Sequence, residues 1–332
     1  MATVGTEPMT LSDWAKRLDP KGNITPVIEA LEQDVPILDD IPWFEGNLPT
    51  GHMTMIRNAL PNITPRAFNQ GVRPTKGGVT KVTEVVTQLA AMFQADRDLL
   101  RLNDNRAAYI ASEMRGFTQA FDQGVTERLF YGSHKDDPAE INGFFARYRP
   151  GEYGEEYVID AGGRGAGNNA SVMMVGWMKG KIACFFPKGL KAGFSFDVKD
   201  GQTLTDAEGG KYIGTEIFYY WNLGLAVEDY RYAVRIANIP MSGTGAITSD
   251  PDGAVKLIEL MIRASERIQS TSGCKPVFYC NRTIREFLRL QITNKSNVNL
   301  SFDTVAGKEI IKFDGIPVRR VDALLNTEDA VV

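Results

Sequence analysis

Reactive side chains are scarce in this 332-residue sequence, which has only two histidines and three cysteines. His52 and His134 lie far apart, and no paired spacing of cysteine or histidine typical of a zinc site is present. Cys184, Cys274 and Cys280 are odd in number, which is typical of free thiols in a reduced compartment. No nucleophile elbow accompanies either histidine. The sequence therefore predicts no metal site, no cofactor and no catalytic residue.

Long apolar runs and a strong net charge are also missing. No stretch approaches the roughly 18 apolar residues that a membrane-spanning helix needs, and residues 1–14 lack the basic and apolar segments of a secretory signal. The 37 basic and 41 acidic residues give a formal net charge of −4. A charge this small excludes the large basic surface of a dedicated nucleic-acid-binding protein. We therefore expect no membrane partner.

Glycine is mildly enriched, at 32 of 332 residues, and the glycine cluster at residues 160–168 invites comparison with a phosphate-binding loop. Such loops bind anions because a helix begins directly after them and directs its free N–H groups at the ligand. The following segment, 171–178, is rich in β-forming residues and has no helical charge pattern, so we expect a strand there. The glycines are therefore predicted to form an inter-strand loop. A β-rich enzyme that uses this loop is the less favoured alternative.

Hydrophobic periodicity predicts an α+β protein without a βαβ rhythm. The strongest helix, residues 105–131, carries one apolar stripe, with Asn105 as N-cap and Gly132 at its end. A long two-stranded hairpin with a polar tip is expected over residues 46–90, and such a hairpin needs another surface because it is marginally stable alone. The remaining predictions are helices 254–269 and 282–292 and strands 172–178, 181–186, 194–198, 217–221, 230–237, 275–280, 309–312 and 316–321.

Three of the local patterns lead to more specific expectations. Lys179-Gly180 is typical of a tight turn, so the strands on either side of it are expected to pair as a hairpin. Arg231 and Arg235 alternate with apolar residues, which predicts a half-buried strand with a basic outer face. Residues 11–18 and 25–32 are predicted as short helices that need to dock on another surface.

Several short segments of the sequence occur in the same order as in a known protein family. They are Glu127-Arg128-Leu129-Phe130-Tyr131-Gly132, Asn142-Gly143-Phe144, Trp221-Asn222-Leu223-Gly224-Leu225, Tyr230-Arg231-Tyr232 and Phe313-Asp314-Gly315-Ile316-Pro317-Val318. With the order of the elements, they make the chain resemble the major capsid proteins of tailed double-stranded DNA bacteriophages. Their fold is the Hong Kong 97-like fold, and the short-tailed phages are most similar. The resemblance covers nearly the whole chain from about residue 20.

The resemblance implies a division of the chain into five parts. These are an acidic N-terminal arm (1–45), an extended hairpin called the E-loop (46–90), a peripheral domain (91–160) with spine helix 105–131, a β-rich axial domain (161–275) and a return to the peripheral domain (276–332). It implies a structural protein, not an enzyme, that self-assembles into hexamers and pentamers of an icosahedral head enclosing double-stranded DNA. An encapsulin-like nanocompartment shell, which shares the fold, is an alternative.

The resemblance also implies partners and a location. Only about 45 residues precede the hairpin, so a separate scaffolding protein is expected during assembly. A portal protein at one vertex, a possible decoration or cement protein, and weak non-specific contact with packaged DNA are implied as well. The protein is expected in the capsid shell of the virion, after assembly in the cytoplasm of the host bacterium.

The distribution of charge supports assembly independently of the resemblance. Residues 1–45 hold nine acids and three bases, whereas residues 46–83 hold five bases and no acid. Opposite charge on two extensions can set the register between subunits. We therefore predict that the hairpin meets the arm, or another acidic patch, of a neighbouring subunit; pairing of the two segments within one chain is the alternative. The predicted contact residues are Arg57, Arg66, Arg73, Lys76, Lys81, Asp34, Asp39, Asp40 and Glu45.

Overall fold

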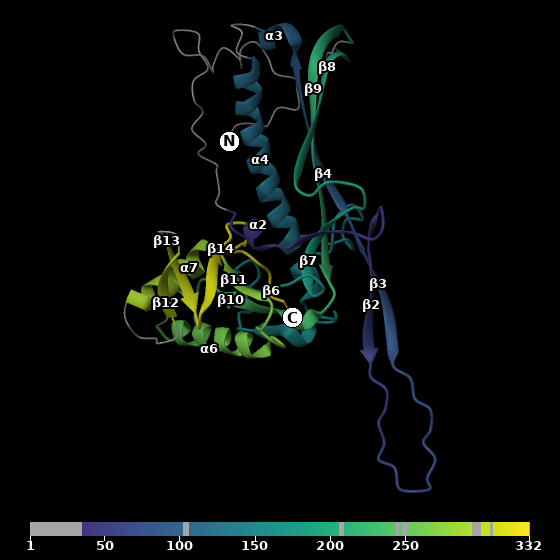
Figure 1. The fold of residues 1–332 in the computed structure, drawn as a ribbon. Coiled ribbons are helices and arrows are strands. Elements are labelled where there is room, and N and C mark those ends of the chain that lie inside the picture. The colour runs from purple at the N-terminus through teal and green to yellow at the C-terminus, as the bar shows by residue number, and fades with distance from the viewer. Residues whose placement is uncertain are drawn as a thin grey trace. The chain divides into compact units, whose positions relative to one another are not determined.

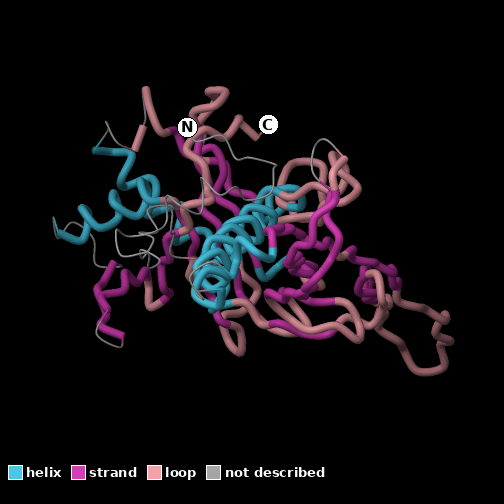
Figure 2. The backbone as a smooth tube through the Cα atoms, turned by 90° about the horizontal axis from the view of Figure 1, so that it is seen from above, coloured by secondary structure: helices cyan, strands magenta, loops and turns pink. Residues whose placement is uncertain are grey.

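The computed structural model describes residues 35–101, 106–205, 209–243, 246–247, 251–293, 300–305 and 308–331. Helices and strands are mixed along this part of the chain, as Figure 2 shows, and it divides into two compact units. The first unit includes residues 88–125 and 191–222, and the second includes residues 35–87, 126–190 and 223–331. The short helices predicted at 11–18 and 25–32, and the N-cap Asn105, lie outside the described residues.

The first unit packs one long helix against a sheet. Its elements are β4 (Thr87–Asp96), α3 (Arg97–Arg101), most of α4 (Arg106–Tyr131), β8 (Phe194–Thr205) and the first part of β9 (Lys211–Val227). The ring of Phe117 on α4 stacks on Tyr219 with 4.5 Å between centroids, and Phe121 meets Phe194 edge-on at 5.3 Å. The predicted helix 105–131 is therefore confirmed, because part of its apolar stripe packs on this sheet.

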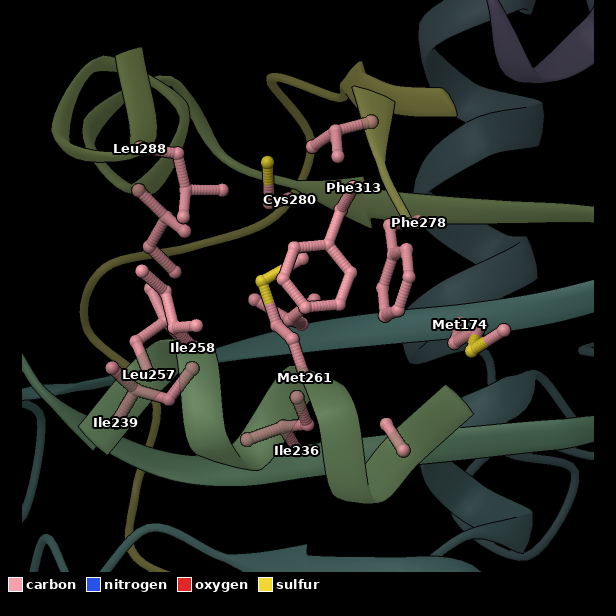
Figure 3. Packing of buried hydrophobic residues seen from close by; sticks show 14 of the residues in the cluster. Met174, Ile236, Ile239, Leu257, Ile258, Met261, Phe278, Cys280, Leu288 and Phe313 are labelled. Carbon is pink, nitrogen blue, oxygen red and sulfur yellow. The ribbon is translucent and has the colours of Figure 1, made fainter. Parts of the chain in front are cut away.

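The second unit is built around a seven-stranded sheet with the order β12-β13-β14-β11-β6-β10-β5, and Figure 1 labels all of these strands except β5. Its strands are β5 (Val158–Asp160), β6 (Asn169–Trp177), β10 (Ala233–Pro240), β11 (Lys275–Cys280), β12 (Leu300–Val305), β13 (Lys308–Phe313) and β14 (Ile316–Arg320). Two helices, α6 (Pro251–Arg267) and α7 (Arg282–Thr293), contribute to the same buried cluster as the sheet, with Met261 and Leu288 near Phe278 and Phe313 (Figure 3).

Several predicted elements of this unit are confirmed. The helices expected at 254–269 and 282–292 are α6 and α7, and the strands at 275–280, 309–312 and 316–321 are β11, β13 and β14. Asn281 accepts a hydrogen bond from the backbone N–H of Ile284 at 2.8 Å, which is the geometry of an N-cap. Strand β12 was not predicted. It completes the edge of the sheet beside β13.

The predicted hairpin around Lys179-Gly180 is wrong. The turn exists, because Gly180 has φ +84° and Met178 and Ile182 form an antiparallel bridge. The strands then separate: β6 pairs with β10 and β11, whereas β7 (Ile182–Phe186) pairs with β1 (Trp43–Glu45) and β9. Turn chemistry is local, but the choice of strand partners depends on distant residues.

The structure of residues 230–237 also differs from the strand predicted there. A short 3-10 helix, η3 (Tyr230–Tyr232), precedes β10, and the first seven residues of β10 are buried. Arg235 is 4% exposed and pairs with Glu328 at 3.0 Å, so the expected basic outer face is wrong. Glu328 also accepts a hydrogen bond from the Tyr131 hydroxyl at 2.7 Å. This buried network holds the C-terminal segment around Glu328 against β10 and the end of α4.

Strand β8 is longer than predicted. Its pairing with β9 is irregular between Asp200 and Gln202, after which β8 continues to Thr205. The remaining short helical elements are α2 (Ile37–Asp40), α5 (Phe144–Arg147) and η2 (Glu155–Tyr157). Cys184 and Cys280 are buried free thiols, and burial raises the pKa of Cys280 to about 12. Both pack as small apolar side chains.

Candidate assembly interface

The hairpin predicted from the sequence is present in the second unit. β2 (Gly51–Ala59) and β3 (Gly78–Val85) form a separate two-stranded antiparallel sheet, and they lie side by side in Figure 1. The register pairs His52 with Glu84 at the root and Arg57 with Val79 at the far end. Two strands alone bury little apolar surface, so the hairpin has few contacts that stabilise it.

The tip of the hairpin, residues 60–76, is exposed along its whole length. Its apex is a turn in which the Gln70 N–H donates to the Ala67 carbonyl at 3.2 Å and Asn69 has φ +65°. The Arg66 Nε donates to the Gln70 carbonyl at 2.7 Å. The side chain of Phe68 therefore projects from a turn with an ordered backbone.

The tip is less polar than predicted. Its apolar side chains are largely uncovered, with exposed fractions of 81% for Leu60, 92% for Ile63, 101% for Phe68 and 60% for Val72. Four exposed apolar side chains on one short loop are characteristic of a surface that binds another protein. These four side chains have no regular spacing along the tip, and the charged and chain-breaking residues around them predict a polar loop instead.

A buried ion pair fixes the root of the hairpin. The Arg147 guanidinium donates to both carboxylate oxygens of Glu84, at 2.7 and 2.6 Å, and the two side chains are 8% and 9% exposed. Arg147 also donates to the carbonyls of Asn142 and Leu225. Burial opposes the charged form of Arg147, but the ion pair with Glu84 outweighs it and raises the pKa. The root is thus held by a bidentate contact of high directional specificity.

A groove of about 620 Å³ lies between β2 and the segments that contain Lys181 and Asp229. Its lining residues are Thr54–Leu60, Gly180, Lys181 and Glu228–Arg231. Lys181 and Arg231 both bind the Asp229 carboxylate at 2.9 Å. Burial raises the pKa of Asp229, but the hydrogen bonds from Arg231 and Lys181 more than compensate and lower the pKa to about 2.

Asp229 is expected to contribute to stability in a pH-dependent way. Its folded pKa of about 2 lies below the ordinary value of 3.8, so its contribution is complete above about pH 4 and is lost as the pH falls towards about 2. Urea unfolding of the wild type and of Asp229→Asn between these pH values is the measurement. The difference in their free energies of unfolding should shrink as the pH falls, and a constant difference would contradict this assignment.

The structure brings the predicted basic residues together on the hairpin. Arg57, Arg66, Arg73, Lys76 and Lys81 are all exposed. None of these five forms an ion pair with an acid in the part of the chain that the structure describes. Their charge is therefore available to a partner.

The predicted acidic residues have different surroundings. Asp34 lies outside the described residues, Asp39 is exposed, and Glu45 is exposed and accepts a hydrogen bond from the Gly189 N–H at 2.8 Å. The Asp40 side chain is fully buried and binds Lys275 at 2.7 Å and Arg319 at 2.9 Å of the same chain. Because its carboxylate is already paired inside the subunit, we leave Asp40 out of the proposed contact.

The glycine cluster at 160–168 connects β5 to β6, as predicted, and no helix follows it. The loop is held from within, since Asp160 binds the side chains of Arg164 and Asn238, both at 2.9 Å. It therefore lacks the helix N-terminus that a phosphate loop uses. In the described ranges no group of three or more His, Cys, Asp or Glu side chains could hold a metal ion. None of the described helices is both long and apolar enough to cross a membrane.

A family model and several solved structures match this chain. The model of the family described as major capsid protein GP7 matches residues 19–332. A chain in a structure of bacteriophage epsilon15 has a TM-score of 0.73 and 29% sequence identity, covering 100% of this chain and 99% of that one. A chain of the bacteriophage JBD30 capsid has a TM-score of 0.52 and 8% identity, covering 89% and 93%. No curated protein matched.

An encapsulin was among the alternatives predicted from the sequence. The encapsulin of Synechococcus elongatus matches with a TM-score of 0.47 and 8% identity, covering 71% of this chain and 98% of that one. The family model that matches residues 19–332 describes a major capsid protein, and not an encapsulin or an enzyme. The prediction of a capsid protein with a Hong Kong 97-like α+β fold is therefore confirmed, and the enzyme alternative is wrong.

Proposed function

The chain belongs to the major capsid protein GP7 family and is a structural protein of a phage capsid shell, and on that premise we propose that the hairpin tip is a surface through which its copies contact one another. One observation carries this proposal. The tip at 60–76 is exposed throughout and bears four uncovered apolar side chains among basic ones. A surface of this kind is costly in water and gains free energy when a partner covers it.

The charge of the hairpin specifies the kind of partner. Positions 46–83 hold five basic residues and no acidic one. We therefore expect the facing surface on the neighbouring copy to carry carboxylates. Asp34, Asp39 and Glu45 of the acidic arm remain our candidates for that surface. Individual exposed ion pairs contribute little, but the same contact is repeated in every copy of a shell.

Family membership also supports finer proposals. We propose that the copies form hexamers and pentamers of an icosahedral head that encloses double-stranded DNA, with weak non-specific contact between protein and DNA. A scaffolding protein during assembly, a portal protein at one vertex and a decoration protein outside remain proposed partners, and the host cytoplasm the proposed place of assembly. The division into arm (1–45), hairpin (46–90), peripheral domain (91–160 and 276–332) and axial domain (161–275) is proposed on the same ground.

Reversing two charges of the tip tests the proposed contact. We expect Arg66→Glu/Arg73→Glu to block or strongly reduce shell formation, because the tip then repels an acidic neighbour, while circular dichroism and thermal unfolding of the subunit stay unchanged. Electron microscopy of purified protein is the measurement. Lys256→Glu/Arg263→Glu is the matched control, because it changes the net charge equally at exposed positions on α6, in the same unit as the tip. Normal shells from the tip variant would refute the contact.

A further inference from the structure

The short helix α5 is in contact with two buried ion pairs of the second unit. Arg147, its last residue, donates to both carboxylate oxygens of Glu84 at the root of the hairpin, at 2.7 and 2.6 Å. The Arg235 guanidinium lies over the ring of Phe145, 3.9 Å from its centroid, and donates to the Tyr148 carbonyl at 3.3 Å. One ion pair therefore ties α5 to the hairpin, and the other ties it to β10.

The ion pair of Arg235 depends on residues 324–331, a segment outside the helices and strands of the sheet. Among residues 325–331 only Glu328 is buried. Its carboxylate binds Arg235 at 3.0 Å and accepts hydrogen bonds from the hydroxyl groups of Tyr131 and Ser171. The segment is thus held by one buried carboxylate and has little apolar surface in the core, so it opens at a lower cost in free energy than the sheet does.

Further hydrogen bonds join this segment to the ends of β6 and β10. Glu328 and Asn169 exchange both of their backbone hydrogen bonds, at 2.8 and 3.1 Å. The side-chain amide of Asn238 donates to the Val331 carbonyl at 2.8 Å and accepts from the Val331 N–H at 2.7 Å. Because water can replace all of these polar contacts, the segment has two states, docked and open.

Opening of the segment leaves Arg235 without a counter-ion. Arg235 is buried, and burial lowers its pKa although Glu328 favours the charged form. A buried guanidinium without its carboxylate is strongly destabilised, so the side chain has to move towards water. That movement withdraws the cation from the Phe145 ring and the donor from the Tyr148 carbonyl. Both contacts hold α5, and α5 carries Arg147, so the root of the hairpin is loosened as well.

We propose that residues 324–331 are a latch that controls the mobility of the hairpin root through α5. With the latch docked, both ion pairs are formed and the root is fixed. With the latch open, α5 loosens and the root opens more often. Because the hairpin carries the proposed contact between copies, an open latch weakens that contact, and this last step alone rests on the proposed function.

Hydrogen exchange of the root amides in dissociated subunits tests the latch. Met53 directs both of its backbone groups to the Asn47 side chain, so by alternation those of His52 and Thr54 face β3. Glu328→Gln removes the charge of the latch and keeps the shape of the side chain. In this variant we expect the His52 and Thr54 amides to exchange at least about tenfold faster than in the wild type.

Asp322→Asn is the matched control, because it removes the same charge from a nearby carboxylate. Asp322 binds Arg282 and Arg320, at 3.2 and 3.0 Å, and neither of them belongs to α5. We expect its root amides to exchange within about twofold of the wild-type rates. The amides of β11, inside the sheet, report global unfolding. If Glu328→Gln accelerates exchange in β11 but not at the root, the segment only stabilises the fold and the latch is refuted.

A milder variant covers the case in which Glu328→Gln does not fold. Tyr131→Phe removes one hydrogen bond to Glu328 and the acceptor of the Leu325 N–H, and it keeps the ring that meets Phe145 edge-on. We expect root exchange about 2- to 10-fold faster, which corresponds to the loss of one or two hydrogen bonds. Root amides that exchange at the wild-type rate in Tyr131→Phe would contradict the latch.

A second background tests whether the effect passes through α5. In Glu84→Met/Arg147→Met the ion pair between α5 and the hairpin is absent. Adding Glu328→Gln to this background is expected to change exchange at His52 and Thr54 by less than about twofold. Acceleration as large as in the wild-type background would overturn the route through α5. Because every measurement uses dissociated subunits, its result is independent of shell formation, whose failure would refute the proposed function alone.

Discussion

Replacing Arg147 with methionine is expected to lower the free energy of unfolding of the subunit by about 3–5 kcal/mol. Arg147 and Glu84 are both more than nine-tenths buried and share two hydrogen bonds at 2.7 and 2.6 Å. The substitution leaves the Glu84 carboxylate inside the protein without its cation, and it removes the donors to the carbonyls of Asn142 and Leu225. An unpaired buried charge is among the most destabilising changes a core can contain. Urea unfolding at neutral pH measures the loss.

The double variant Glu84→Met/Arg147→Met is the control for this prediction. Removing both charges eliminates the desolvation cost together with the attraction, so we expect most of the lost stability to return. Arg147→Lys should be intermediate, because lysine keeps the charge but cannot form the bidentate contact. If Arg147→Met unfolds at the wild-type urea concentration, the ion pair does not hold the root of the hairpin in solution.

Replacing Phe68 with serine is expected to weaken the contact between copies by roughly 10- to 100-fold. Phe68 is 101% exposed at the apex of the tip, on a turn closed by the Gln70 N–H and the Ala67 carbonyl. Covering a phenylalanine side chain gains about 1.5–3 kcal/mol, and each 1.4 kcal/mol is about a factor of ten in affinity. Aromatic side chains presented on ordered backbone are frequent anchors of protein interfaces. The lowest protein concentration that yields shells should therefore rise.

The subunit itself should be unaffected, because Phe68 is fully exposed and covers no other residue in the part of the chain that the structure describes. Thermal unfolding of the dissociated subunit is expected to be the same for Phe68→Ser and the wild type. Phe68→Leu is the matched control, since leucine keeps an apolar side chain at the apex and should assemble at close to the wild-type concentration. Shells of Phe68→Ser that form at the wild-type concentration would show that the apex is not buried in the assembly.

Much of the fold could be predicted because its patterns are local. The long helix α4 follows from one apolar stripe, and the hairpin from two strand-forming segments around a tip rich in proline and glycine. The basic surface of the hairpin was predicted for the same reason, because five bases without an acid lie between positions 46 and 83. The order of these elements along the chain was sufficient to indicate the capsid family.

Other features of the candidate interface could not be predicted from any local pattern. Arg147 and Glu84 are 63 residues apart, and Asp40 and Arg319 are 279 residues apart, so only the folded chain shows that these charges neutralise each other. The Asn47 side chain forms two hydrogen bonds with the backbone of Met53, which it reaches by turning back to a strand six residues away. Nothing in the identity of Arg235 distinguishes it from an exposed arginine until Glu328 is placed beside it.

The sequence by itself determined the helices, the hairpin and the separation of charge between arm and hairpin, because each depends on residues that are close together in the chain. Only the tertiary structure decided which strands pair and which charges are buried. Those outcomes depend on the desolvation of groups that are distant in sequence, and a charge becomes available to a partner only when the fold leaves it uncovered.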